Sequence, residues 1–273
     1  MKVNVKFFLV VILAGLMLSS CGTTSTVPLT GRKHSLLVDD QQVLSLSTQQ
    51  YTQLMSKSKL STNAQNTALV KRVGQRLATA VENYLRNHGA ANELQFFKWE
   101  FNLISENQVN AFCMPGGKIA VYEGLLPVTK DEASLAIVVG HEIAHAVAKH
   151  SAEQMSKQLR QQYGSQILGS VLGSVVGQGA GDLAAQVAAT GFSFANLKYS
   201  RENEYEADYM GLIFAAMAGY DPQVAIPFWQ RMSSNKSAQS SEFFSDHPSD
   251  ANRIAKLQAA LPEAMKYYNA AKK

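Results

Sequence analysis

The chain has 273 residues, of which 46% are hydrophobic and 17% are charged, and its formal net charge is +4 at pH 7. Such a composition is typical of a globular protein with one sizeable core. The small and dispersed positive charge argues against a nucleic-acid-binding protein, and the absence of an internal sequence repeat argues against a solenoid.

The N-terminus resembles that of an exported bacterial lipoprotein. Residues 1–20 contain two lysines and an apolar run over 7–18, which is too short to span a bilayer comfortably. The run leads through small residues to Cys21, a pattern that resembles the lipobox, so we expect removal of residues 1–20 and acylation of Cys21. Because Gly22 rather than Asp follows, we expect a lipid-anchored protein on the outer membrane that faces the periplasm.

Residues 21–38 are rich in Thr, Ser, Gly and Pro and show no apolar periodicity, as expected of a tether between the lipid and a folded domain. We place that domain at residues 39–262 and a C-terminal tail at 263–273. Cys113 is the one cysteine of the domain, so no internal disulfide is available to it, and its apolar neighbours predict that it is buried.

The first half of the domain combines helices with short strands. Apolar residues recur every three or four positions over residues 39–59 and 64–88, which predicts two amphipathic helices, the second ended by Gly89. Aromatic and β-branched residues dominate 95–104 and 117–122, and the second run follows a Pro-Gly-Gly turn signal. These two runs predict a small antiparallel sheet.

The second half is predicted to be helical, so the fold class is α+β and mainly helical. Helices are expected at residues 131–150, 151–163, 199–217, 222–233 and 249–261. Residues 164–195 form a Gly- and Ala-rich tract, with glycines at a spacing also seen where membrane helices touch. Its most apolar stretch is well short of the roughly 20 residues needed to span a bilayer, so we expect a flap or soluble insert.

The sequence His-Glu-Ile-Ala-His, which begins at His141, predicts a metal site. Positions four apart share one face of a helix, so His141 and His145 can hold one ion while Glu142 takes a proton from water. Zinc suits this site because it binds imidazole and carboxylate and leaves a position open for water. The plainer alternative is two solvated histidines on an ordinary helix. His150 is a poor ligand, because five positions rotate it by about 140° around a continuous helix.

A third protein ligand is expected in the acidic segment 200–208. Two pairs compete there, Glu204 with Asp208 and Glu202 with Glu206, and spacing alone does not choose between them. In either pair the first carboxylate could bind the metal while the second accepts a hydrogen bond from a ligand imidazole. A solvated acidic face is the alternative without a function.

Four ordered motifs carry a family resemblance. The segments HEIAH, SRENEYEAD and DHPSDANRI, preceded by NAFCMPGGKIAVYEGLL, together resemble the HtpX-like and CAAX-prenyl-endopeptidase type of gluzincin zinc metallopeptidases, in particular their outer-membrane lipoprotein members. The resemblance covers residues 30–262. The sequence departs here from those relatives that carry transmembrane helices or a helical-repeat domain. The resemblance implies a zincin-like domain whose small antiparallel sheet packs on the helix that bears the two histidines.

The resemblance also implies roles for individual residues. Glu204 matches the third zinc ligand, and Asp208 matches an aspartate behind a ligand histidine. His247 and Arg253 match late residues that assist transition-state stabilisation. The stretch Asn110 to Val121 matches the edge strand that pairs with an extended substrate, beginning with Asn110, Ala111 and Phe112.

These assignments predict a zinc endopeptidase with one Zn²⁺ per chain, which cleaves periplasmic or outer-membrane proteins in envelope quality control. The competing interpretation is a non-enzymatic outer-membrane assembly or chaperone lipoprotein that retains the fold. A purely structural zinc site is disfavoured, because such sites usually close with four Cys or His ligands. The natural substrate and the oligomeric state are left open.

A regulatory hypothesis concerns His247, which lies in a Ser-Asp-His-Pro loop. Neutral imidazole is a good zinc ligand, so His247 could close the fourth zinc position and switch the enzyme off, with residues 164–195 acting as a lid. A purely catalytic His247 is the alternative.

Overall fold

The structure is a computed structural model that describes residues 23–167, 191–234, 242–247 and 251–272. The predicted fold class, α+β and mainly helical, is confirmed. The helices are α2 (Asp40–Lys57), α3 (Ala64–Asn87), η2 (Ala91–Phe96), η3 (Glu123–Leu125), α4 (Leu126–Thr129), α5 (Glu132–Val147), α6 (His150–Ile167), α8 (Arg201–Met217), η4 (Pro222–Val224), α9 (Ala225–Ser234), α11 (Glu242–Asp246) and α12 (Ala251–Ala271). The strands are β1 (Thr23–Thr26), β2 (Lys33–Leu36), β3 (Glu100–Ile104), β4 (Ala111–Met114) and β5 (Lys118–Tyr122).

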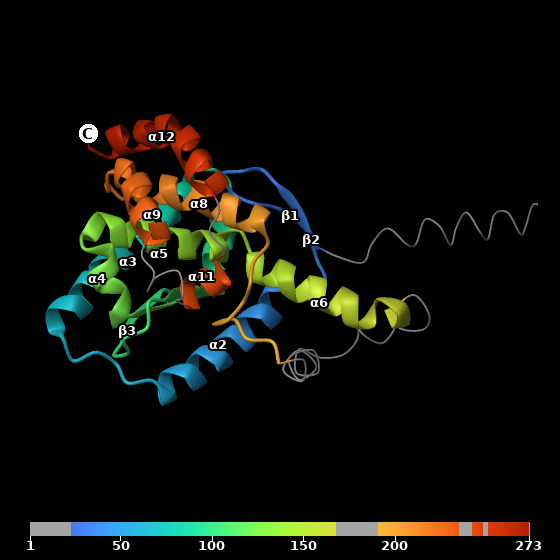
Figure 1. The fold of residues 1–273 in the computed structure, drawn as a ribbon. Coiled ribbons are helices and arrows are strands. Elements are labelled where there is room, and N and C mark those ends of the chain that lie inside the picture. Colours follow the sequence, from blue (N-terminus) through green and yellow to red (C-terminus); the bar gives the residue numbers. More distant parts are fainter. Residues whose placement is uncertain (1–22, 168–190, 235–241, 248–250, 273) are drawn as a thin grey trace, which may run out of the picture.

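Helix α5 lies in the middle of the body (Figure 1), with α8, α9 and α12 on one side and the sheet and α2 on the other. The two predicted N-terminal helices are confirmed within two residues at each end. Asp39 caps α2 by accepting from the backbone of Gln42, and α3 ends just before Gly89, whose φ of +75° is the left-handed conformation that suits glycine.

The three-stranded sheet has the order β3-β5-β4, so β5 is central. Strands β4 and β5 pair antiparallel, as expected of a hairpin, whereas β3 and β5 pair parallel. The sheet is therefore mixed. Strand β4 does not pair with β3, and β5, which follows β4 after a turn, lies between the two. The predicted edge strand Asn110 to Val121 consequently divides into an edge strand, β4, and the central strand, β5.

Both faces of this sheet are buried, and alternate residues enter two different clusters of the core. Ile119 and Val121 join the cluster around α3, α5 and α8, whereas Ala120 and Tyr122 join the cluster around α2 and α6. Helix α5 thus packs against the sheet on one face, which holds the helix of the metal motif beside β4.

The prediction of a strand over residues 95–104 is correct only for its second half. The first residues belong to η2, and β3 begins at Glu100. The aromatic residues that suggested a strand are explained by packing instead, since the rings of Phe97 and Trp99 stack with centroids 4.7 Å apart. Aromatic enrichment reports a half-buried surface rather than a backbone preference.

The expected tether differs from the structure in its described part. Residues 23–36 form the antiparallel hairpin β1–β2, in which Thr26 pairs with Lys33. Val27 and Leu36 are buried, and polar residues of the turn between the strands bind acidic side chains of α6 and α8. Pro and Gly in this segment thus serve the turn and not a flexible spacer.

The C-terminal helix is longer than predicted. Helix α12 continues past Pro262 to Ala271, so residues expected in a tail are helical. Burial of Ala264 and the packing of Tyr267 and Tyr268 on the core offset the hydrogen bond that proline lacks. The predicted flap, residues 164–195, has residues 168–190 outside the described residues, and the described residues Phe192 and Phe194 are buried.

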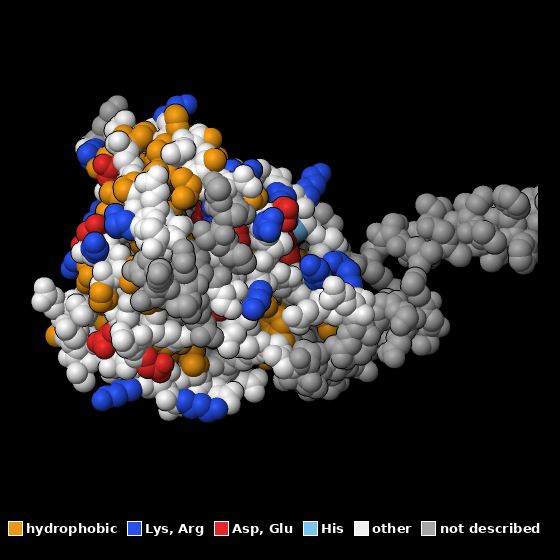
Figure 2. Space-filling view, in the orientation of Figure 1, with side chains coloured by type: hydrophobic (Ala, Val, Ile, Leu, Met, Phe, Trp, Pro, Cys, Tyr) orange, Lys and Arg blue, Asp and Glu red, His pale blue; other side chains and the backbone are white. Residues whose placement is uncertain are grey.

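Cys113 is buried, as predicted, while Cys21 and the export segment lie outside the described residues. Among the helices that the structure describes, none is both long and apolar enough to cross a membrane. Lys and Arg side chains are scattered over the face shown in Figure 2 and do not gather in one patch there. The exclusion of a nucleic-acid partner stays a prediction.

Candidate metal centre

Helix α5 brings the two motif histidines to one face. Asp131 caps the helix by accepting a hydrogen bond from the backbone of Ser134 at 2.7 Å, and every residue from Ser134 to Val147 is buried. The Nε2 atoms of His141 and His145 lie 3.1 Å apart, as the four-residue spacing predicts.

Helix α8 supplies the carboxylate. Ser200 and Asn203 form a capping box at its start, which places Glu204 in the first turn and facing α5. The Glu204 carboxylate lies 3.4 Å from Nε2 of His141 and 3.5 Å from Nε2 of His145. Glu202, the rival third ligand, is exposed, so the structure selects Glu204.

A pair of glycines permits this close approach of α5 and α8. A Cβ on Gly211 would lie 2.7 Å from the Cα of His141, and a Cβ on Gly140 would lie 2.8 Å from the carbonyl oxygen of Gly211. The two helix backbones therefore touch at the first ligand histidine. Sequence reasoning missed these glycines, because neither is near the other in sequence and neither breaks its helix.

His247 is the fourth member of the cluster. Its Nδ1 lies 3.2 Å from Nε2 of His141 and 3.1 Å from Oε1 of Glu204. Within the described residues, one donor atom each from His141, His145, Glu204 and His247 lies within 4.8 Å of the others, and all four side chains are buried. The sequence predicted three of them as ligands, and His247 either as a catalytic group near the zinc or as a fourth donor that closes the site.

The donor set fits zinc. With Zn–N bonds of about 2.0–2.1 Å, the donors of a tetrahedral site lie roughly 3.3–3.4 Å apart. Five of the contacts among these side chains, counting both oxygens of Glu204, run from 3.1 to 3.5 Å, and all four donors lie within 4.8 Å of one another. Two imidazole nitrogens that face each other at 3.1 Å need a cation or a proton between them, and imidazole with carboxylate is a donor set that zinc favours.

Asp208 and Arg253 stand behind the ligands. Oδ1 of Asp208 lies 3.0 Å from Nδ1 of His141, on the side of that ring away from the donor cluster. Arg253 donates to both oxygens of Asp208 at 2.7 Å, and its Nη1 lies 3.2 Å from Oε2 of Glu204. Burial raises the pKa of Asp208, but Arg253 outweighs burial and holds that pKa below its ordinary value.

Glu142 lies beside the donor atoms without joining them. Its Oε1 is 3.4 Å from Nε2 of His247, and burial raises the pKa of its carboxyl. Burial also lowers the pKa of His145. For His141, the lowering by burial is exceeded by the nearby carboxylates of Asp208 and Glu204, so its pKa rises to about 9. A zinc ion must therefore displace a proton at neutral pH.

A narrow cavity reaches Glu142 from the edge of the sheet. It is lined by Asn110, Ala111, Phe112 and Cys113 from the β4 side, by Glu142, Asp246 and His247, and by Phe194, Ala195, Leu197 and Tyr199. The ring of Tyr199 stacks on His145 with centroids 3.9 Å apart. The segment before α8 thus covers the ligands, a role that its sequence did not reveal.

The comparisons with known proteins agree with this geometry. Residues 64–261 match the family described as Peptidase family M48. The Arabidopsis thaliana mitochondrial metalloendopeptidase OMA1 is 39% identical over 183 residues, which cover 66% of this chain and 36% of that protein. The protein of the same name from Schizosaccharomyces pombe is 32% identical over 187 residues, which cover 67% and 53%. A putative beta-barrel assembly-enhancing protease of Vibrio cholerae is 30% identical over 159 residues, which cover 56% and 33%.

These relatives also correct one expectation and limit another. The chain spans only about a third to a half of their length. The outer-membrane location expected from the sequence is contradicted, because the relatives of higher identity among these are named as mitochondrial proteins. The resemblance to gluzincin metallopeptidases is confirmed at the level of peptidase family M48, and the match does not resolve the HtpX-like type within it. The donor cluster and a match that covers most of the domain together show that this chain belongs to peptidase family M48.

Proposed function

We propose that this chain is a zinc-dependent endopeptidase that hydrolyses peptide bonds of protein substrates. The observation that carries the proposal is the buried cluster of His141, His145 and Glu204 with Glu142 next to it. Zinc bound there would polarise the scissile carbonyl and make water a nucleophile at neutral pH.

Glu142 is the proton carrier in this proposal. Its carboxylate sits in the cavity, and burial raises its pKa toward the working range of a general base. It would accept a proton from the attacking water and deliver it to the leaving amine. Among the described residues that line this cavity, Asp246 is the other carboxylate, and it lies at the end of α11 next to His247.

His247 and Arg253 differ in what they can do for a developing oxyanion. Arg253 is buried and holds Asp208 with a two-bond fork, so we assign it to positioning the carboxylates. His247 lines the cavity and is the better candidate to stabilise the oxyanion. Both assignments follow from where the nitrogen atoms lie and are proposals.

The substrate would bind along β4. An edge strand offers main-chain hydrogen bonds to an extended peptide without regard to its sequence, and residues 110–113 line the cavity that holds Glu142. Phe194 and Leu197 line the same cavity, so we expect their segment to move before a peptide can reach Glu142.

We further propose that the position of His247 corresponds to a latent state of the enzyme. With Nδ1 of His247 among the donor atoms, four side chains surround one position, whereas a catalytic zinc site keeps a position open. The proximity of His247 is the observation that supports the regulatory hypothesis stated from the sequence. Within peptide-bond hydrolysis, we propose a role in protein quality control. This proposal does not include the bacterial envelope that the sequence suggested.

The test uses the whole chain and the variant Glu142→Gln. We expect the variant to retain zinc at the wild-type ratio and to cleave casein about 10²–10⁴-fold more slowly, the usual contribution of a general base. Cleavage at the wild-type rate would exclude Glu142 as the base. A wild-type chain that binds zinc and cleaves nothing would favour the non-enzymatic alternative.

A further inference from the structure

A chain of hydrogen bonds leaves the metal centre from the back of His145. The Nε2 atom of His145 faces the donor cluster, and its Nδ1 lies 2.9 Å from Nδ1 of His150. Nε2 of His150 lies 2.9 Å from Oε2 of Glu206. Both imidazoles are fully buried, so water does not compete for these contacts.

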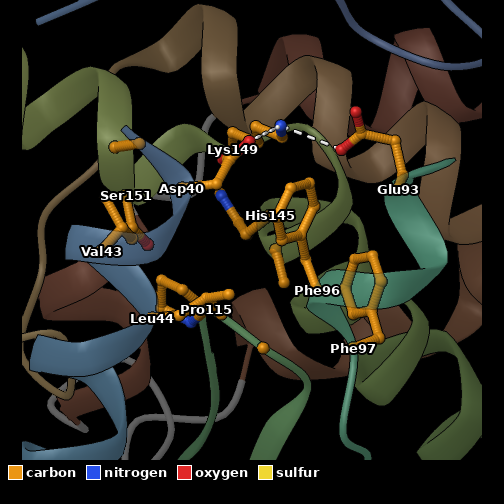
Figure 3. Close-up of a pocket in the computed structure, with 13 residues that line it drawn as sticks. Asp40, Val43, Leu44, Glu93, Phe96, Phe97, Pro115, His145, Lys149 and Ser151 are labelled. Carbon is orange, nitrogen blue, oxygen red and sulfur yellow. Dashed lines mark hydrogen bonds and ion pairs between the residues drawn. The ribbon is translucent and has the colours of Figure 1, made fainter. Parts of the chain in front are cut away.

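His150 reaches His145 because the helix breaks between them. Lys149 has a φ of +58°, a left-handed conformation that ends α5 and starts α6 in a new direction. Its ammonium group is held by Asp40 at 2.8 Å and by Glu93 at 2.9 Å, and Figure 3 draws these two ion pairs as dashed lines. A continuous helix would have turned His150 away from His145.

The proton positions along this series of hydrogen bonds follow from the need of a metal for an unprotonated ligand nitrogen. If Nε2 of His145 binds zinc, its proton is on Nδ1, so Nδ1 of His150 must be the acceptor. The proton of His150 is then on Nε2 and is donated to Glu206. One arrangement of protons therefore satisfies both contacts, and it fixes His145 in the tautomer that presents Nε2 to the metal.

This series of hydrogen bonds ends on the N-terminal hairpin. Oε2 of Glu206 accepts from Nε of Arg32 at 2.7 Å, and Oε1 accepts from the hydroxyl of Thr30 at 2.5 Å. Both residues lie in the turn between β1 and β2. Arg32 also binds Glu153 on α6 at 2.6 Å, so the hairpin holds the same carboxylate of Glu206 that His150 contacts.

We propose that His150 and Glu206 are positioning residues for the metal ligand His145, and that the hairpin β1–β2 tunes metal affinity through Arg32. This inference rests on the proposed zinc site and adds to it residues that touch no metal. It also gives a role to one member of the rival pair Glu202 and Glu206. Glu206 supports a ligand imidazole, but it does so through His150, and Glu202 is not a ligand.

The proposal is tested by zinc affinity, measured with a competing chelator on the whole chain. His150→Phe keeps an aromatic ring and removes the acceptor, and we expect zinc to bind about 10–100-fold more weakly, as when other residues that orient a ligand are lost. His150→Asn restores an acceptor for His145 and should recover part of the affinity. Arg32→Gln should shift the affinity in the same direction by a smaller factor.

Glu206→Gln is the second variant and Glu202→Gln its matched control, four positions earlier on α8 and exposed. We expect a loss of zinc affinity for Glu206→Gln and none for Glu202→Gln. The visible absorption bands of the Co²⁺-substituted chain should shift in the His150 and Glu206 variants, a change that loss of stability alone does not produce.

Two results would overturn the inference in different ways. Unchanged zinc affinity and Co²⁺ bands in both His150→Phe and Glu206→Gln, with stoichiometric zinc in the wild type, would overturn the positioning role and leave the proposed function standing. A wild-type chain without zinc would overturn both. Thermal unfolding of each variant in chelator identifies a variant that fails to fold, and the other variant then decides.

Discussion

At the scale of single residues, the metal centre depends on one buried arginine. Arg253 is 2% exposed and compensates two buried carboxylates, Asp208 and Glu204. Such a cation is hard to replace, because removal of one partner leaves the other charge buried and unpaired. Its guanidinium also lies over the ring of Trp229, 4.4 Å from the centroid.

Arg253→Met is therefore expected to lower the free energy of unfolding of the zinc-free chain by about 3–5 kcal/mol, the usual cost of breaking a buried pair. Urea denaturation in the presence of a chelator measures this. Arg72→Met is the matched control, because Arg72 binds Glu132 at the surface and should lose much less. Equal losses in the two variants would show that Arg253 has no special role.

Acid stability gives a second prediction at this scale. Burial raises the pKa of Glu153, but hydrogen bonds and charges from His34 and Arg32 outweigh burial and hold that pKa at about 2, below its ordinary value of 4.5. Because the pKa is lower in the folded state, the stabilisation is complete above pH 4.5 and is lost as the pH falls toward 2.

Glu153→Gln should thus flatten the dependence of unfolding free energy on pH between these two values, and it should lower stability at neutral pH. Denaturant titrations at a series of pH values check both. A variant with the slope of the wild type would mean that the hairpin does not hold the ionised carboxylate in solution.

At the scale of elements, the site depends on how closely α5 and α8 approach. Gly211→Ala would place a methyl group within 2.7 Å of the Cα of His141, and backbone cannot move aside as a side chain can. We expect a loss of about 1–3 kcal/mol in stability, as for other overpacked contacts, together with weaker zinc binding because the helices separate. Gln75→Ala, on the exposed side of α3, should change neither. Thermal unfolding and chelator competition measure the two effects.

The elements also show how far the sequence led. Periodicity of apolar residues and capping residues predicted α2, α3, α5 and α8 closely, because those signals are local. The fixed spacing of His141 and His145 predicted the core of the site for the same reason. The parallel pairing of β3 with β5 could not be predicted, because it depends on which strands meet in space.

Contacts over long sequence distances account for what was missed. Arg32 and Glu206 are 174 positions apart, and nothing in either neighbourhood points to the other. The composition of the hairpin resembled a tether because Pro, Gly and Thr are frequent in both. His150 was expected to point away from the site on a continuous helix, and its contact with His145 needed the helix break at Lys149, a conformation that lysine rarely takes.

At the scale of the whole molecule, one ion would join three segments that lie far apart in the sequence. The donors come from α5, from α8 and from the residue after α11, so zinc binding should stabilise the fold as a unit. At a free zinc concentration 100 times the dissociation constant, linkage predicts a gain of about 2.7 kcal/mol.

The melting temperature should therefore rise with zinc and fall when a chelator is added. The same titration on Glu204→Ala should show no rise, because a carboxylate donor is missing. A melting temperature of the wild-type chain that does not respond to zinc would show that the ion is not bound by the folded state.

The measurement that tests the central claim most directly is the zinc content of the purified chain, determined by mass spectrometry for the wild type, Glu204→Ala and Glu142→Gln. We predict one zinc per chain for the wild type and for Glu142→Gln, and a large loss for Glu204→Ala. A wild-type chain without stoichiometric zinc, or a Glu204→Ala chain that holds as much as the wild type, would contradict a site built from His141, His145 and Glu204.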